Sequence, residues 1–145
     1  MTTSSYQPHQ WVCDVCKKPI QKPEDGYVVW NDDGQGPKDI LVIHQGRCDD
    51  DSRENSAALG DFLGANGMAR LTAMMSYGPL IGDSKRTIAD LAGFTDFFRR
   101  MQLPYYEEAR RKFKHPDVRA DFHGANEIAP YLPENLKSIS EYPDA

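Results

Sequence analysis

The sequence predicts an α+β fold, in which a small β-hairpin module near the N-terminus precedes a mainly helical domain. The module is indicated by two short runs of β-branched and aromatic residues with a turn-rich stretch between them. The helical domain is indicated by apolar residues that recur at helical spacing from residue 56 onward. We expect the module to span residues 11–50 and the helical domain 56–140, with a flexible N-terminus over 1–10 and a tail over 141–145.

Composition and charge exclude several classes of protein. The chain has 145 residues, of which 17 are basic and 22 acidic, so its net charge of −5 makes the whole chain a poor ligand for polyanions. No stretch approaches the roughly 18 consecutive apolar residues of a membrane span, and the first ten residues lack the basic and apolar regions of a secretory signal. We therefore expect a cytoplasmic protein with no membrane partner.

The three cysteines all lie in the first third of the chain. An odd number of cysteines without an export signal argues against a disulfide framework. Cys13 and Cys16 have the C-x2-C spacing that lets two thiolates converge on one ion, and His44 and Cys48 follow as H-x3-C. Three thiolates and one imidazole suit the borderline softness of zinc, and four protein ligands leave no open position for a substrate. The pattern predicts one structural Zn²⁺ held by Cys13, Cys16, His44 and Cys48.

Two other interpretations of the cysteines are weaker. A redox C-x-x-C normally opens a helix after a strand, whereas here Lys17, Lys18 and Pro19 follow at once. Incidental burial of the thiols would leave unexplained why every cysteine and one histidine stand at ligand spacing.

A β-hairpin is expected between the two ligand pairs. Its strands are the runs YVVW at residues 27–30 and ILVI at residues 40–43, and the turn-rich residues 31–37 separate them. The second strand ends at His44.

At this point the chain resembles the zinc-ribbon and treble-clef group, in which a C-x2-C knuckle precedes a hairpin and a second ligand pair follows it. The likeness covers residues 11 to about 48. The chain differs from LIM modules in its longer insert, its H-x3-C spacing and the lack of a second set of cysteines. The resemblance implies a zinc ion that stabilises the fold and a surface for binding. The residues that match the start of LIM-like modules are Cys13, Cys16, Pro19, Ile20, Gly26, His44 and Cys48.

The remainder is expected to hold four or five helices, and a short further one near the C-terminus, after a polar linker over residues 49–55. Three consecutive aspartates in that linker could hold Mg²⁺, but such chemistry needs carboxylates on rigid elements. Methionines of the second helix are expected to fill the core. The expected helices run from Ser56 to around Ala65, Asn66 and Gly67, from Met68 to about Gly78, from Asp83 or Ser84 to Gly93, from Thr95 to Met101, from Pro104 to Lys114 and from Glu134 to Ile139.

One segment, residues 97–114, is positively charged and interleaves basic with aromatic side chains. Basic groups for phosphates beside rings for stacking are what a nucleic-acid surface needs. The aromatic residues fit the core face of an amphipathic helix equally well, so both interpretations stay open. The candidate contacts for nucleic acid or another partner are Arg99, Arg100, Arg110, Arg111, Lys112 and Lys114.

No motif for a nucleophile or for a phosphate-cradling loop is present, so we assign no catalytic and no organic cofactor-binding residues. The sequence favours a non-enzymatic, zinc-stabilised adaptor or regulator that binds another protein. A nucleic-acid-binding or transcription-associated regulator that uses residues 97–114 is the first alternative, and a metal-dependent nuclease-like enzyme is the second. The residues that could contribute to a nuclease-like or second metal site are His115, Asp121, His123, Asn126 and Glu127.

Overall fold

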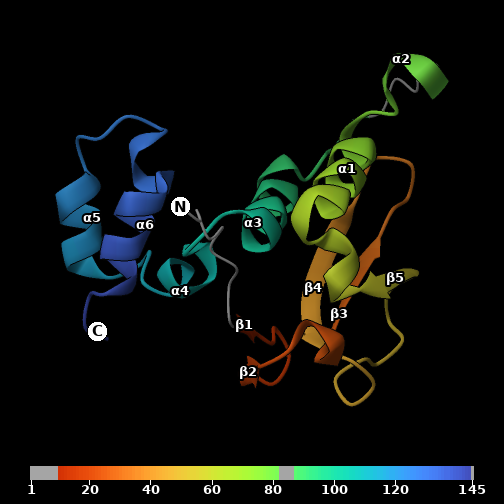
Figure 1. Cartoon of the computed structure of the whole chain (residues 1–145), viewed down its shortest axis with the longest axis horizontal. Helices are drawn as coiled ribbons and strands as arrows, with labels where there is room; N and C mark the ends of the chain where they lie inside the picture. The colour runs from red at the N-terminus through yellow and green to blue at the C-terminus, as the bar shows by residue number, and fades with distance from the viewer. Residues whose placement is uncertain (1–9, 82–86, 145) are drawn as a thin grey trace, which may run out of the picture. The chain divides into compact units, whose positions relative to one another are not determined.

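The protein has an α+β fold, as the sequence predicts, and a computed structural model describes residues 10–81 and 87–144. The chain forms two compact units, divided between Gln102 and Leu103 (Figure 1). We call the described residues up to Gln102 the N-terminal unit and those from Leu103 onward the C-terminal unit. The sequence instead suggested a boundary between residues 50 and 56, with the hairpin module on one side and all the helices on the other. None of the helices described is long and apolar enough to cross a bilayer.

The sheets of the N-terminal unit contain the predicted hairpin. Strands β1 (Trp11–Val12) and β2 (Pro19–Ile20) pair antiparallel, and a 3-10 turn over Pro23–Asp25 leads into the second sheet. There β3 (Gly26–Asn31) pairs antiparallel with β4 (Lys38–His44), with Gly26 opposite His44. Both strands carry the expected β-branched runs, and β4 ends at His44 as predicted.

The prediction of a helix from Ser56 is wrong, because strand β5 (Asn55–Ala58) lies there instead. This strand pairs antiparallel with β3, which places Ala57 opposite Val28 and gives the sheet order β4-β3-β5. The Tyr27 hydroxyl donates a hydrogen bond to Ser56 Oγ at 3.0 Å. The open edge of β3 supplies the backbone hydrogen bonds, and these outweigh the weak strand preference of small residues.

Helix α1 (Gly64–Met75) follows a 3-10 turn over Leu59–Phe62. Gly67 was expected to end a helix, and instead it lies inside α1. A Cβ atom at this position would lie 2.0 Å from the carbonyl carbon of Phe62, so only glycine permits this close approach. Met68 and Met75 are exposed, so the prediction that they fill the core is wrong.

Helix α3 (Leu91–Gln102) is a single helix where the sequence predicted the end of one and the start of another. It follows the short helix α2 (Gly78–Ile81), and the predicted start at Asp83 or Ser84 lies outside the described residues. Gly93 is helical because the Asp90 carboxylate caps the helix and accepts a hydrogen bond from the Gly93 N–H at 3.0 Å.

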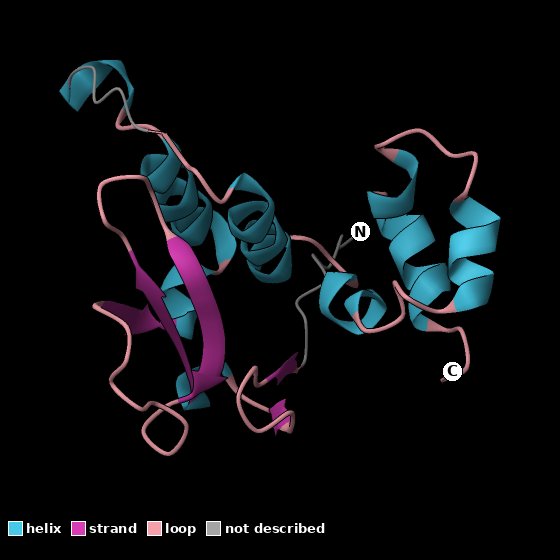
Figure 2. Cartoon of the chain, turned by 180° about the vertical axis from the view of Figure 1, so that it is seen from behind, coloured by secondary structure: helices cyan, strands magenta, loops and turns pink. Residues whose placement is uncertain are grey.

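The hairpin and helices α1 and α3 share one hydrophobic core. Both helices lie on the same face of the β3–β4 sheet (Figures 1 and 2). The Phe62 and Phe97 rings meet edge to face at 5.1 Å between centroids, which joins the turn before α1 to α3. The N-terminal unit is therefore stabilised as one body. The buried apolar residues include Trp11, Ile20, Val28, Val42, Ile43, Leu59, Phe62, Leu71, Phe94, Phe97 and Met101.

The C-terminal unit consists of short helices around a small core of its own. Helix α4 (Tyr106–Arg110) begins later than the predicted helix, after Tyr105 with a φ of 66°, and it also ends before the predicted Lys114. Helix α5 (Pro116–Phe122) was not expected, although Pro116 stands at a favoured first-turn position. A 3-10 turn over Ala129–Tyr131 precedes helix α6 (Pro133–Ser140), which was predicted. The buried core residues are Tyr106, Ala109, Val118, Leu136 and Ile139.

Candidate metal centre

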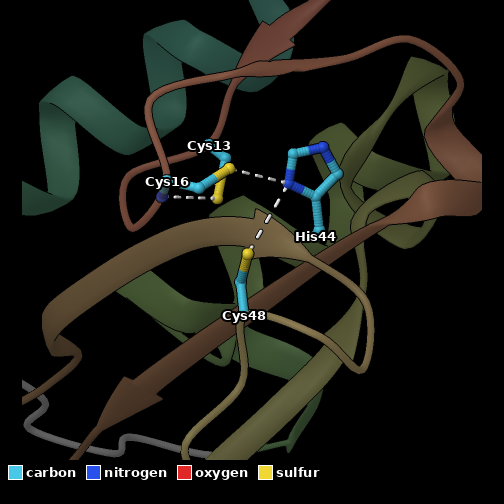
Figure 3. Close-up of side chains that lie close together, drawn as sticks. All are labelled: Cys13, Cys16, His44 and Cys48. Carbon is cyan, nitrogen blue, oxygen red and sulfur yellow. Dashed lines mark hydrogen bonds between the residues drawn. The ribbon is translucent and has the colours of Figure 1, made fainter.

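The structure brings together the four residues that the sequence singled out as metal ligands. Cys13 and Cys16 lie in the loop between β1 and β2, His44 ends β4, and Cys48 lies in the turn that follows (Figure 3). One donor atom from each residue lies within 4.8 Å of the other three. Within residues 10–81 and 87–144 this is the one group of three or more histidine, cysteine or carboxylate side chains that close together.

Local backbone geometry forms the Cys13–Cys16 loop, which we call the knuckle. The Cys13 N–H donates to the carbonyl of Lys18 at 3.0 Å, and the Lys17 N–H donates to the carbonyl of Cys13 at 2.9 Å. Lys17 has a φ of 64°, which reverses the chain within a few residues. The Cys16 N–H lies 3.5 Å from the sulfur of Cys13, so the Cys13 side chain points back toward the other end of the loop.

The His44 ring is oriented so that one nitrogen faces the thiols. Its Nδ1 lies 3.3 Å from the sulfur of Cys16 and 3.7 Å from the sulfur of Cys48. Its Nε2 lies 2.9 Å from the carbonyl oxygen of Pro19. A carbonyl oxygen only accepts hydrogen bonds, so Nε2 carries the proton and Nδ1 keeps its lone pair for a metal.

These distances fit a tetrahedral ion. Zinc holds thiolate sulfur at about 2.3 Å and imidazole nitrogen at about 2.0 Å, which places the two donor atoms roughly 3.6 Å apart. The separations of His44 Nδ1 from the sulfurs of Cys16 and Cys48, 3.3 and 3.7 Å, lie on either side of that value. None of the three thiols is in a disulfide. The four side chains can therefore hold one metal ion, next to an antiparallel hairpin, as in a zinc-binding module.

The pKa values of the Cys13 and Cys48 thiols are shifted in opposite directions. Burial, the largest single influence, raises the pKa of the Cys13 thiol. Hydrogen bonds from the backbone of Cys16, Val15 and His44 outweigh burial and lower that pKa to about 6 from its ordinary 9.0. Burial raises the pKa of the Cys48 thiol, and hydrogen bonds to the other two cysteines raise it further. Metal binding must therefore displace a proton from Cys48.

Asp14, inside the knuckle, is a residue that sequence reasoning missed. Its Oδ2 accepts hydrogen bonds from the Val42 N–H at 2.8 Å and from Nη1 of Arg100 at 2.8 Å. Arg100 also donates from Nη2 to the carbonyl of Val12 at 3.0 Å, and its own carbonyl accepts from Nε1 of Trp11 at 3.1 Å. No local sequence signal points from Asp14 to a partner 86 positions away.

The six basic residues predicted as a contact surface are divided between the two units. Arg99 and Arg100 lie in α3, and the other four lie beyond residue 103. The Arg100 side chain is 3% exposed because it contacts the knuckle. Lys112 is 6% exposed, and its Nζ donates to the carbonyl of Tyr142 and lies 2.9 Å from Asp144 Oδ1. Arg111 and Lys114 are exposed, and Arg99 and Arg110 are half-buried.

Several of the residues considered for a nuclease-like site make other contacts within the C-terminal unit. His115 Nδ1 accepts a hydrogen bond from the Asp117 N–H at 3.1 Å and so caps α5. Asn126 Oδ1 accepts from two backbone N–H groups in the next turn. Asp121 accepts from the Tyr142 hydroxyl, and His123 and Glu127 are exposed. In the part of the chain that the structure describes, these side chains form no metal-ligating cluster.

The aspartates at 49–51 are also part of local turns. Asp49 Oδ1 accepts from the Asp51 N–H at 2.9 Å, and Asp50 Oδ1 accepts from the Ser52 N–H at 3.0 Å. Such turns are the usual structural use of aspartate in a polar loop. The structure therefore adds nothing that favours a magnesium site here.

Comparison of the chain with protein-family models, with curated proteins and with solved structures finds no match. The likeness to zinc-ribbon and treble-clef modules therefore rests on the ligand cluster and on the β3–β4 hairpin beside it.

Proposed function

We propose that the protein is a non-enzymatic, zinc-stabilised adaptor, which holds one structural Zn²⁺ and binds another protein. The closed cluster of Cys13, Cys16, His44 and Cys48 is the observation that carries this proposal, because its donor atoms lie within 4.8 Å of one another. Four protein ligands complete a tetrahedral shell, so the ion would stabilise the fold and would have no position left for a substrate.

The donor set supports zinc over other metals. Hard cations such as Mg²⁺ and Ca²⁺ prefer oxygen ligands, and this cluster has none. Iron–sulfur clusters are usually held by four thiolates, whereas here an imidazole replaces one of them. Zinc accepts three thiolates and one imidazole in structural sites without strain.

Metal analysis of protein purified without added metal tests the zinc site. We expect about one equivalent of zinc in the wild type, by analogy with other closed Cys₃His sites. The His44→Ala variant should lose most of the zinc, whereas His123→Ala, which removes an exposed histidine outside the cluster, should keep it. A wild type without zinc, or an unchanged zinc content in His44→Ala, would disprove the site.

Exposed apolar residues near the end of α1 support a protein partner. Leu80 and Ile81 of α2 are 95% and 78% exposed, and Tyr77 is about half exposed. Tyr77 also lines a groove together with Trp30 and Met74. Exposed apolar surface of this kind favours an apolar segment of another protein. Nucleic acid would need exposed basic groups instead, and two of the six candidate basic residues are buried.

A comparison of variants tests this protein-binding surface. The wild type, a Leu80→Asp, Ile81→Asp double variant and an Ile128→Asp, Leu132→Asp control are used to capture proteins from nuclease-treated lysate. The control changes two apolar residues of the C-terminal unit that are also exposed. We expect at least one protein to be retained by the wild type and the control and to be lost with the first double variant. Identical captured proteins for all three would contradict the proposed surface.

A further inference from the structure

We propose that Arg100 is a positioning residue for the metal centre, whose guanidinium holds the knuckle in the conformation that presents Cys13 and Cys16 to His44 and Cys48. This inference rests on the proposed zinc function and names a residue that no metal ligand set would include. Arg100 lies in α3, far from the ligands in sequence, and it contacts the knuckle directly.

The guanidinium donates hydrogen bonds to the residues on either side of Cys13. Nη1 donates to the carboxylate of Asp14 at 2.8 Å, and Nη2 donates to the carbonyl of Val12 at 3.0 Å. Because the guanidinium is planar and rigid, these two bonds define both the position and the tilt of the backbone that carries the Cys13 thiol.

The same carboxylate oxygen connects the knuckle to the strand that carries His44. Asp14 Oδ2 accepts from the Val42 N–H at 2.8 Å, and the Asp14 N–H donates to the Val42 carbonyl at 2.8 Å. Val42 lies in β4, two residues before His44. Asp14 therefore lies between α3 and β4, and the pair of cysteines is held at a defined distance from the histidine.

Arg100 is itself held in place. Its side chain is 3% exposed, and its carbonyl accepts a hydrogen bond from Nε1 of Trp11 at 3.1 Å. Trp11 is a buried core residue of β1, the strand that leads into the knuckle. A side chain whose surroundings are packed can orient a ligand loop precisely enough for tetrahedral coordination.

A purely structural ion pair makes a different prediction. Replacing a buried ion pair by apolar groups of similar size often costs little stability, because burying the charges is itself unfavourable. The guanidinium bonds to Val12 and Asp14, however, go to the two residues that flank the ligand Cys13. If they position the knuckle, their loss should weaken metal binding and change the ligand geometry in protein that remains folded.

The decisive experiment compares metal binding by the full chain in the wild type, Arg100→Met, Arg100→Lys, Asp14→Asn and Arg53→Met. Arg53→Met is the matched control, because Arg53 also donates to a carbonyl of β4, that of Asp39, at 3.1 Å. Zinc dissociation constants are measured by competition with a chelator. The absorption bands of Co²⁺ in place of zinc report the ligand geometry.

We expect Arg100→Met to raise the zinc dissociation constant by about 10- to 100-fold and to shift the Co²⁺ bands. Arg100→Lys keeps the charge without the rigid fork, so it should recover part of the affinity, and Asp14→Asn should lie between the wild type and Arg100→Met. Arg53→Met should match the wild type. If Arg100→Met does not fold, the test rests on Arg100→Lys and Asp14→Asn. Zinc affinities and Co²⁺ spectra like those of the wild type in both of these variants would overturn the proposal.

A probe without metal separates this proposal from the zinc site. Phenylarsine oxide bridges two neighbouring thiols and releases water, so in a Cys48→Ser background it reports whether Cys13 and Cys16 are held together. Adding Arg100→Met to that background should weaken arsenical binding by about tenfold if Arg100 positions the knuckle. Absence of zinc from the wild-type protein would disprove the proposed function but not the positioning of the thiols by Arg100. Equal arsenical binding with and without Arg100 would disprove that positioning role.

Discussion

The polar contacts around the candidate metal centre in the N-terminal unit span far more of the chain than the cap of helix α5 in the C-terminal unit. In the N-terminal unit, His44 contacts Pro19, 25 residues earlier, and Arg100 contacts Asp14, 86 residues earlier. In the C-terminal unit, His115 caps helix α5 by accepting a hydrogen bond from the N–H of Asp117, two residues later. Groups brought together from distant positions depend on the whole unit being folded. Local caps need only the turn that contains them.

This difference explains where a metal is useful. The β1–β2 pair is only two residues long in each strand, and the knuckle between them is held by a few hydrogen bonds. A metal ion that joins the knuckle to the end of β4 would close this loop at its weakest point. The C-terminal unit, with its own small buried core and a side-chain cap on α5, contains no metal cluster within the residues that the structure describes.

Metal removal should cause the largest difference in stability between the two units. We expect a chelator to destabilise the N-terminal unit by several kcal/mol, because a structural zinc ion contributes its binding energy to folding. Loss of protection should extend from the hairpin into α1 and α3, which share its core. Hydrogen exchange with and without chelator measures this. Loss confined to residues 11–50 would show that the hairpin module unfolds by itself.

The second largest effect is expected from Gly67→Ala. Alanine favours helices over glycine, but its Cβ would lie 2.0 Å from the Phe62 carbonyl carbon. We expect a net loss of about 1–3 kcal/mol of unfolding free energy in the N-terminal unit, as for other overpacked sites. Urea unfolding measures it, with Gly60→Ala as the control, because no atom lies within 4 Å of a Cβ there. Equal stability of the two variants would mean that α1 can move away from Phe62.

A smaller effect is expected in the C-terminal unit from His115→Ala. This change removes the acceptor for the Asp117 N–H at the start of α5, and such caps contribute about 0.5–2 kcal/mol. His123→Ala, at an exposed position after the same helix, serves as the control. Thermal unfolding monitored separately for each unit should show the loss in the C-terminal unit alone. An equal loss in both units would contradict an effect confined to the C-terminal unit.

The smallest effect concerns nucleic acid. Titration of labelled DNA and RNA should show weak binding that disappears at physiological salt, because two of the six candidate basic residues are buried. An Arg110→Glu, Arg111→Glu double variant should therefore change little under those conditions. Tight wild-type binding at physiological salt that is abolished in a folded double variant would replace the proposed protein partner by a nucleic acid.

Much of the hairpin and ligand cluster could be predicted from residue type and spacing. The runs at 27–30 and 40–43 became β3 and β4, and His44 ends β4 as expected. The helical half was predicted less well, because glycine has two opposite uses. Gly67 and Gly93 were interpreted as helix ends, but both lie inside helices, one through a close backbone approach and one beside a capping aspartate.

The sequence by itself determined the donor set and the turn that brings Cys13 and Cys16 together, because metal preference and tight turns depend on residues a few positions apart. Only the tertiary structure decided that Asn55–Ala58 forms a strand and that the hairpin and helices share a core. It also decided that Arg100 faces the knuckle and not the solvent. The physical reason is that edge pairing and the burial of a charge depend on partners that the chain supplies from far away, and no local pattern records them.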